Sequence, residues 1–235
     1  MSACPIAVAA VTLLSIVDPH HALAEDFGKL LSTPLVAPGP ELEPVVRIAW
    51  MDVADAAPGL APIAVAEAKA VLGRLGLGLV WRRASPGELA RPDEIRVILL
   101  NRAAVDPTAH VPVLGSTPAE PNALPYVWIH VPSIQGMLGL SARSPIEMAG
   151  PEQRALGVAL GRVAAHEIVH SLTPGMPHGK GLMSARFTRQ QLTAARMPIE
   201  PEVALAVRSA LRGETARARE VGLLTTGVAA EEIGP

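Results

Sequence analysis

The 235-residue sequence predicts one mixed α+β domain built on a five-stranded sheet. Two observations support this class. Short apolar stretches of strand character follow one another between residues 45 and 131, with one helical segment among them, and a long helical segment comes after the last of them. The composition, 49% hydrophobic and 18% charged, is that of a chain with a sizeable core. Aromatic residues make up only 3%, so aliphatic side chains must fill that core.

The strands are predicted from β-branched and apolar runs bounded by turn residues. The run 94–101 is apolar on both faces, as a central strand should be. The run 110–119 contains Pro112 and Gly115, which favour an edge position. The five predicted strands are 45–53, 77–83, 94–101, 110–119 and 126–131.

Four helices are predicted from apolar residues at helical spacing. The first, 61–76, ends on a glycine. The longest, 151–172, begins with a proline and a glutamate in its first turn, where both residues are favoured. Shorter helices are expected at 188–196 and 201–213, followed by a frayed tail to residue 235.

Charge and cysteine content exclude several classes of protein. The formal net charge of −2 lacks the basic field that nucleic-acid binding needs. Cys4 is the only cysteine, so neither a disulfide within the chain nor a cysteine-based zinc site can form.

Residues 1–24 have the pattern of a signal peptide, because an apolar run precedes a small-x-small site at Ala24. No Lys or Arg precedes that run, and a buried N-terminal element is the alternative. The run is too short to span a membrane, so no stable membrane insertion is expected. Export would make the protein secreted or periplasmic; without it the protein is cytoplasmic. Residues 25–44 form a Pro-rich lead to the main domain, which we expect at 45–200.

The long helix carries two histidines, His166 and His170, one turn apart and pointing the same way. They fall opposite a predicted core-facing stripe, so we expect the helix to hold them out on its free side. The stripe consists of Leu156, Leu160, Ala164, Ile168 and Leu172.

Two histidines at this spacing can both bind one zinc ion, and Glu167 between them can serve as a general base. A catalytic zinc site needs a third protein ligand, and His178 is the candidate. Pro174 and Gly175 predict the turn that brings it back to the metal. The alternative is a helix with paired surface histidines, followed by a loose turn.

The stretch from His166 to Met183 resembles the metzincin clan of zinc peptidases, and especially small bacterial relatives with HExxH, seven residues, His and Gly-Ile/Leu-Met. The resemblance implies a zincin-like mixed sheet with an antiparallel edge strand that lines the substrate cleft, one backing helix and an active-site helix. It also implies that Met183 belongs to a methionine turn beneath the metal. Thr173 replaces the clan's helix-ending glycine, and the gap to His178 is two residues longer.

The resulting hypothesis is a zinc-dependent endopeptidase acting on peptide or protein substrates. Two alternatives are a protein braced by zinc and a catalytically silent peptide-binding relative of a peptidase. A closed structural zinc site would need a fourth ligand, which the residues near the motif do not supply. The remaining rare side chains are interpreted as structural: His110 as exposed, His130 as half-buried, Tyr126 as packing, and Trp50, Trp81 and Trp128 as core anchors.

Overall fold

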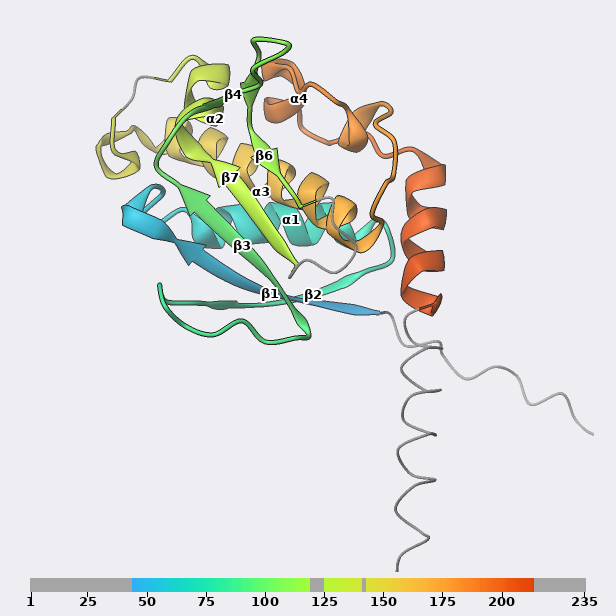
Figure 1. The fold of residues 1–235 in the computed structure, drawn as a ribbon. Coiled ribbons are helices and arrows are strands. Elements are labelled where there is room, and N and C mark those ends of the chain that lie inside the picture. Colours follow the sequence, from blue (N-terminus) through green and yellow to red (C-terminus); the bar gives the residue numbers. More distant parts are fainter. Residues whose placement is uncertain (1–43, 119–124, 141–142, 214–235) are drawn as a thin grey trace, which may run out of the picture. The chain divides into compact units, whose positions relative to one another are not determined.

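The computed structural model describes residues 44–118, 125–140 and 143–213, all within one unit of the chain, Leu42–Pro235. A five-stranded sheet has helices α1 and α3 on one face (Figure 1). The strands of that sheet are β1 (Val45–Asp52), β2 (Gly78–Arg83), β3 (Glu94–Leu100), β6 (Gly115–Ser116) and β7 (Tyr126–His130). The helices are α1 (Ala61–Gly73), α2 (Val131–Leu138), α3 (Gly150–Leu172), α4 (Arg189–Thr193) and residues 201–213.

The strand order is β2-β1-β3-β7-β6, and only β6 runs antiparallel to its neighbour. The mixed sheet with an antiparallel edge strand is therefore confirmed in outline. β3 lies in the centre, and four of its residues from Glu94 to Val97 are buried in succession, as expected for a strand covered on both faces.

The edge strand is shorter than predicted. Within 110–119, Pro112–Val113 (β5) pairs with Ala104–Val105 (β4) in a separate two-stranded sheet, and only Gly115–Ser116 pairs with β7. Leu114 between them still accepts a hydrogen bond from the backbone N–H of His130, at 2.9 Å. Pro112 has no N–H to donate, which favours its place in the smaller sheet.

The helices differ from the predictions mainly at their ends. The chain leaves α1 at Gly73 and reverses at Gly76, which has a φ of +80°. α4 is only five residues long, although Thr188 and Gln191 form the expected kind of N-terminal capping box. α2 was not predicted: it begins directly after the last strand with Val131 and Pro132, and proline is favoured in a first turn.

The prediction that α3 buries one side and leaves the other free is wrong. Every residue from Ala159 to Val169 is buried, including His166. α1 and the sheet cover one side of the helix, and the segment that includes Leu182, Met183 and Leu192 adds core residues on the other. The histidines therefore face an internal site between packed segments.

α1 and α3 pack closely because two glycines of α3 lie at their crossing. A Cβ at Gly157 would come within 2.7 Å of the Ile63 side chain, and one at Gly161 would collide with the backbone carbonyl of Ala64. Together with the surrounding aliphatic core, this contact fixes the position of the helix that carries the histidines.

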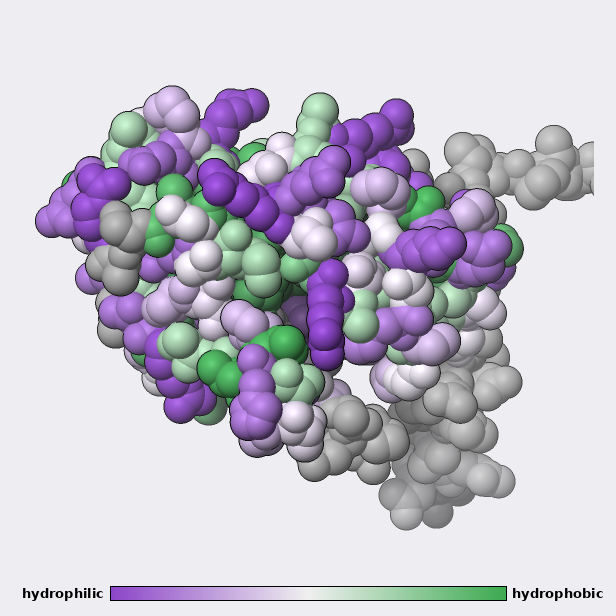
Figure 2. Space-filling view, turned by 90° about the horizontal axis from the view of Figure 1, so that it is seen from above, coloured by the Kyte–Doolittle hydropathy of each residue, from purple (hydrophilic) through white to green (hydrophobic). Residues whose placement is uncertain are grey.

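Seen from above, the molecule shows many hydrophilic residues and a hollow near the middle of the face, with hydrophobic residues on part of its wall (Figure 2).

Among the described residues, none of the helices has the length and apolar character needed to cross a membrane. The predicted signal peptide and Pro-rich lead lie outside the described residues. The division of the chain into domains stays a prediction.

Arg162 links three segments from inside the core. Its side chain, only 1% exposed, donates to the Glu67 carboxylate at 2.7 Å and to the carbonyl oxygens of Gln191 and Ala194 at 2.7 and 2.6 Å. These bonds satisfy the buried guanidinium and tie α4 to α1 and α3.

We expect Arg162→Met to lower the free energy of unfolding by about 3 kcal/mol, because it leaves Glu67 and two carbonyls without their buried donor. Urea unfolding measures the change. Arg154→Met, at an exposed position of the same helix, should stay within about 0.5 kcal/mol of wild type. Equal stability of the two variants would contradict the anchoring role of Arg162.

Candidate metal centre

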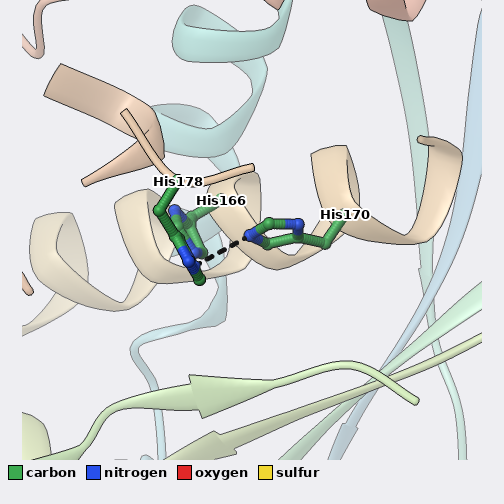
Figure 3. A group of neighbouring side chains, drawn as sticks. All are labelled: His166, His170 and His178. Atoms are coloured by element: carbon green, nitrogen blue, oxygen red, sulfur yellow. Dashed lines mark hydrogen bonds between the residues drawn. The ribbon is translucent and has the colours of Figure 1, made fainter. Parts of the chain in front are cut away.

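Three histidines converge at the C-terminal half of α3. His166 and His170 extend from the helix, and His178 comes back from the segment that follows it (Figure 3). The Nε2 atoms of His170 and His178 are 3.2 Å apart, and one nitrogen from each ring lies within 4.8 Å of the other two. His166 is buried, His170 half-buried and His178 exposed, so the group opens from the interior toward solvent.

The turn after α3 brings His178 back as predicted, without a glycine at the helix end. Thr173 leaves the helix at a φ of −131°, which a side chain tolerates, and its hydroxyl donates to the carbonyl of Val169 at 2.6 Å. Gly175, two residues later, takes the left-handed conformation with a φ of +80°. The left-handed glycine thus lies two residues later than the helix-ending glycine of the metzincin pattern. This shift accounts for the spacing to His178, which is longer by the same two residues.

The backbone orients the ring of His166. Its Nδ1 lies 2.7 Å from the carbonyl oxygen of Leu182. A carbonyl can only accept, so Nδ1 carries the proton and Nε2 keeps a lone pair for a metal ion. The ring of Phe187 packs edge-on against that of His166, with centroids 5.3 Å apart. Burial lowers the pKa of His166 to about 4, and it also lowers the pKa of His170. Both are then neutral at pH 7, the form that binds metals.

The segment after His178 is held by contacts with residues 198–200. Leu182 donates its N–H to the carbonyl of Pro198 at 2.8 Å, and Lys180 donates its N–H to the carboxylate of Glu200 at 3.1 Å. Gly181 has a φ of +57°, and a Cβ there would collide with the Pro198 carbonyl. Glycine is thus required in this turn. Met183 is buried, and its carbonyl accepts from the N–H of Gly179, next to His178, at 2.8 Å.

Glu167 points away from the helix toward the edge strand β6. Its side chain is almost fully buried, and burial raises its pKa to about 7, against the opposing effect of a hydrogen bond from Thr117. The Thr117 hydroxyl lies 2.9 Å from Oε2, while Oε1 lies 3.9 Å from Nε2 of His166. The carboxyl group therefore flanks the three histidines.

The donor set fits a zinc ion. Two nitrogen ligands of a tetrahedral zinc ion are about 3.3 Å apart, given zinc–nitrogen bonds of about 2.0–2.1 Å, and His170 and His178 nearly have this spacing. Within the described part of the chain, no Cys, Asp or Glu joins the three histidines as a fourth ligand. Three imidazoles without a fourth protein ligand are typical of catalytic rather than structural zinc sites.

The side chains interpreted as structural lie outside this group. His130 is buried, and its Nδ1 is 3.2 Å from the carbonyl of Arg102. His110 is exposed. Trp50 is a core residue, and the half-buried Trp81 packs against the core. Trp128 is half-buried and is not part of that core cluster, so the prediction that all three anchor the core is wrong for Trp128. Tyr126 stacks on Trp128 with centroids 6.4 Å apart, a packing role as predicted.

Sequence reasoning did not find Thr117, the Leu182 carbonyl or Glu200 as neighbours of the site. Each reaches it through a contact between segments distant in sequence, such as the 50 residues that separate Thr117 from Glu167. Gly115 did carry a signal, because a glycine inside a strand often marks a close approach. A Cβ at Gly115 would come within 2.8 Å of the Glu167 side chain.

Comparison with known proteins gives a likeness in fold to a solved structure but no match in sequence. No protein-family model matches the sequence, and no curated protein matches it. The fold is similar to the crystal structure of archaemetzincin from Methanopyrus kandleri, with a TM-score of 0.50 and 12% sequence identity over 71% of this chain and 96% of that one. At this identity the likeness shows a shared fold.

The pKa shifts of His166 and Glu167 have opposite directions, and they predict how the free energy of unfolding of the metal-free protein depends on pH. Folding disfavours the proton on His166, so that stability is lost as the pH falls from about 6.5 to 4. Folding favours the proton on Glu167, so that stability is gained as the pH falls from about 7 to 4.5. The two effects nearly cancel in the wild type.

Glu167→Gln removes the opposing contribution of Glu167. We therefore expect the free energy of unfolding of this metal-free variant to fall by an amount on the order of 3 kcal/mol between about pH 6.5 and 4, because folding disfavours the proton on His166. Urea unfolding at several pH values measures it beside wild type. Glu147→Gln, at an exposed residue, should follow the wild-type curve. Parallel curves for Glu167→Gln and wild type would show that the buried pair does not titrate in this way.

Proposed function

We propose that this protein is a zinc-dependent endopeptidase that hydrolyses peptide bonds, with His166, His170 and His178 as metal ligands and Glu167 as general base. The observation that carries the proposal is the group of three imidazole nitrogens within 4.8 Å of one another, beside a buried carboxyl group whose pKa is raised to about 7. The fold shared with archaemetzincin adds support.

Zinc is the proposed cofactor because the donor set consists of three imidazoles, and one of them has its second nitrogen fixed by a backbone carbonyl. A bound zinc ion supplies Lewis acidity to a water molecule and to the scissile carbonyl. The histidines hold the ion, and the hydrogen bond from His166 to Leu182 keeps the ring in the tautomer required.

Glu167 takes a proton from the attacking water and passes it to the leaving amine. A base works best when its pKa is near the working pH, and burial brings that of Glu167 into this range. Oε1, 3.9 Å from Nε2 of His166, is the oxygen that faces the histidines. It is therefore the atom that we assign to the proton transfer.

The proposed substrate is an extended peptide laid along β6. This strand is the last in the sheet order, and among the described residues it pairs only with β7, which leaves its other edge for strand addition. Gly115 and Thr117 lie beside Glu167, so a peptide on this edge would pass the catalytic carboxyl group.

The proposal also covers the role of Met183, the bounds of the catalytic domain and the export of the protein. Met183 serves as the residue of the methionine turn, an apolar support behind the histidines, in keeping with its burial and its bond to Gly179. Residues 45–200 make up the catalytic domain, and residues 1–24 direct export. N-terminal sequencing of the mature protein, with Glu25 as the expected first residue, tests the export proposal.

Two non-enzymatic readings compete with this one, a zinc-braced protein and a catalytically silent peptide binder. A zinc site that only stabilises the fold does not need a carboxyl group beside its three histidines. Burying such a group costs free energy, as the raised pKa of Glu167 indicates. The position of Glu167 thus favours hydrolysis over both alternatives.

We expect purified wild-type protein to contain about one zinc per chain and to cleave members of a mixed peptide library. Glu167→Ala should retain the zinc and lose at least about a hundredfold in kcat, because the proton acceptor is gone. His178→Ala should lose most of the zinc. Elemental analysis measures the zinc content, and mass spectrometry of the peptides measures cleavage.

His110→Asn serves as the control, since His110 is exposed at a φ of +52°, which asparagine tolerates. It should keep the zinc of the wild type. Zinc without cleavage in the wild type would favour the non-enzymatic readings. Absence of zinc from protein purified with zinc supplied would refute the metal site.

A further inference from the structure

We propose that Thr117 is a positioning residue for Glu167: its hydroxyl holds Oε2, so that Oε1 is left facing the histidines. This inference rests on the proposed function, in which Oε1 receives the proton. It adds a residue that directly follows the edge strand β6 to the proposed catalytic apparatus of the motif helix.

The contact joins the residue that follows β6 to the C-terminal half of the motif helix α3. The Thr117 hydroxyl is 2.9 Å from Oε2 of Glu167 and 3.1 Å from the backbone carbonyl oxygen of the same residue. A hydroxyl has one hydrogen, which it can donate to either acceptor. Both acceptors belong to Glu167, so the threonine holds the side chain and the backbone of the base together.

The environment makes this bond important for orientation. Glu167 is only 6% exposed, so bulk water cannot readily replace a lost donor. The two carboxyl oxygens are chemically equivalent until a neighbour distinguishes them. Of the two carboxyl oxygens, Oε2 is the one that accepts from Thr117, and Oε1 is the one near His166. The hydroxyl thereby selects which oxygen is available as the base.

Gly115, in β6, also limits the position of the Glu167 carboxyl group. A Cβ at this position would lie 2.8 Å from both Cγ and Oε1 of Glu167 and 2.9 Å from the Val163 side chain. Thr117 follows β6, two residues after Gly115, and its hydroxyl contacts Oε2 of the same carboxyl group. The backbone at Gly115 and the hydroxyl of Thr117 therefore confine the carboxyl group from two sides and restrict its rotation.

A purely structural role for Thr117 makes a different prediction. A bond that only docks the edge strand onto α3 would, when removed, lower stability and alter peptide binding, with its main effect on Tm and KM. A positioning role predicts a loss in kcat while zinc content and KM are retained, since the misplaced base matters only in the transition state.

The test compares Thr117→Val, which removes the hydroxyl but keeps the shape, with Thr117→Ser, which keeps the hydroxyl. Thr193→Val is the matched control, because that exposed hydroxyl also donates to a backbone carbonyl, of Arg189, but lies on α4. Zinc content, Tm, kcat and KM are measured for each zinc-loaded protein. We expect Thr117→Val to lose about 10- to 100-fold in kcat with KM within about twofold, and Thr117→Ser to recover most of the activity.

A second readout does not need turnover. In protein labelled with carbon-13 at the glutamate side-chain carboxyl, the signal absent from Glu167→Gln identifies Glu167. We expect Thr117→Val to shift this signal and Thr117→Ser to leave it near its wild-type position. Should Thr117→Val fail to fold, Thr117→Ala replaces it in both measurements.

The outcomes separate this inference from the proposed function. An active wild type together with a folded, zinc-loaded Thr117→Val whose kcat is within about twofold of it would overturn the positioning role and leave the peptidase assignment intact. A zinc-loaded wild type that cleaves no peptide would overturn the peptidase assignment and with it the positioning of a base. The carbon-13 signal then decides the contact alone: if it is unchanged in Thr117→Val, Thr117 does not hold the carboxyl group at all.

Discussion

The hydrogen bond from His166 to the Leu182 carbonyl is the interaction on which the site depends. It joins the motif helix to a turn sixteen residues further along and fixes which ring nitrogen faces the other histidines. Leu182 is itself held, since its N–H donates to Pro198. The orientation of the buried His166 ring is thus set by backbone groups, which tolerate changes of side chain better than a bond between two side chains would.

The same turn is built around a close approach that only glycine permits. Gly181 brings the chain against the Pro198 carbonyl in a left-handed conformation, and the bond from Gly179 to Met183 closes the turn beside His178. Glu200 secures the next residue, Lys180. The third histidine is therefore presented by a turn with several independent supports, although its own side chain is exposed.

Glu167 lies at the meeting of three constraints. Burial in α3 raises its pKa, the edge strand confines its carboxyl group, and Thr117 bonds one of its oxygens. Each constraint would be costly for a residue with no chemical task, because a buried carboxyl group destabilises the fold unless it is well satisfied. A catalytic base needs this combination of restricted geometry and raised pKa.

The sequence by itself determined the strands, the long helix and the set of residues that meet at its end. Hydrophobic periodicity and turn residues are local properties, so the strand cores, α3 and the reversal at Pro174 and Gly175 could all be predicted. Tertiary structure alone decided that α3 is buried all round from Ala159 to Val169, that the edge strand is short, and that Thr117, Leu182 and Glu200 reach the site. These features follow from packing between segments far apart in the chain, which no local pattern encodes.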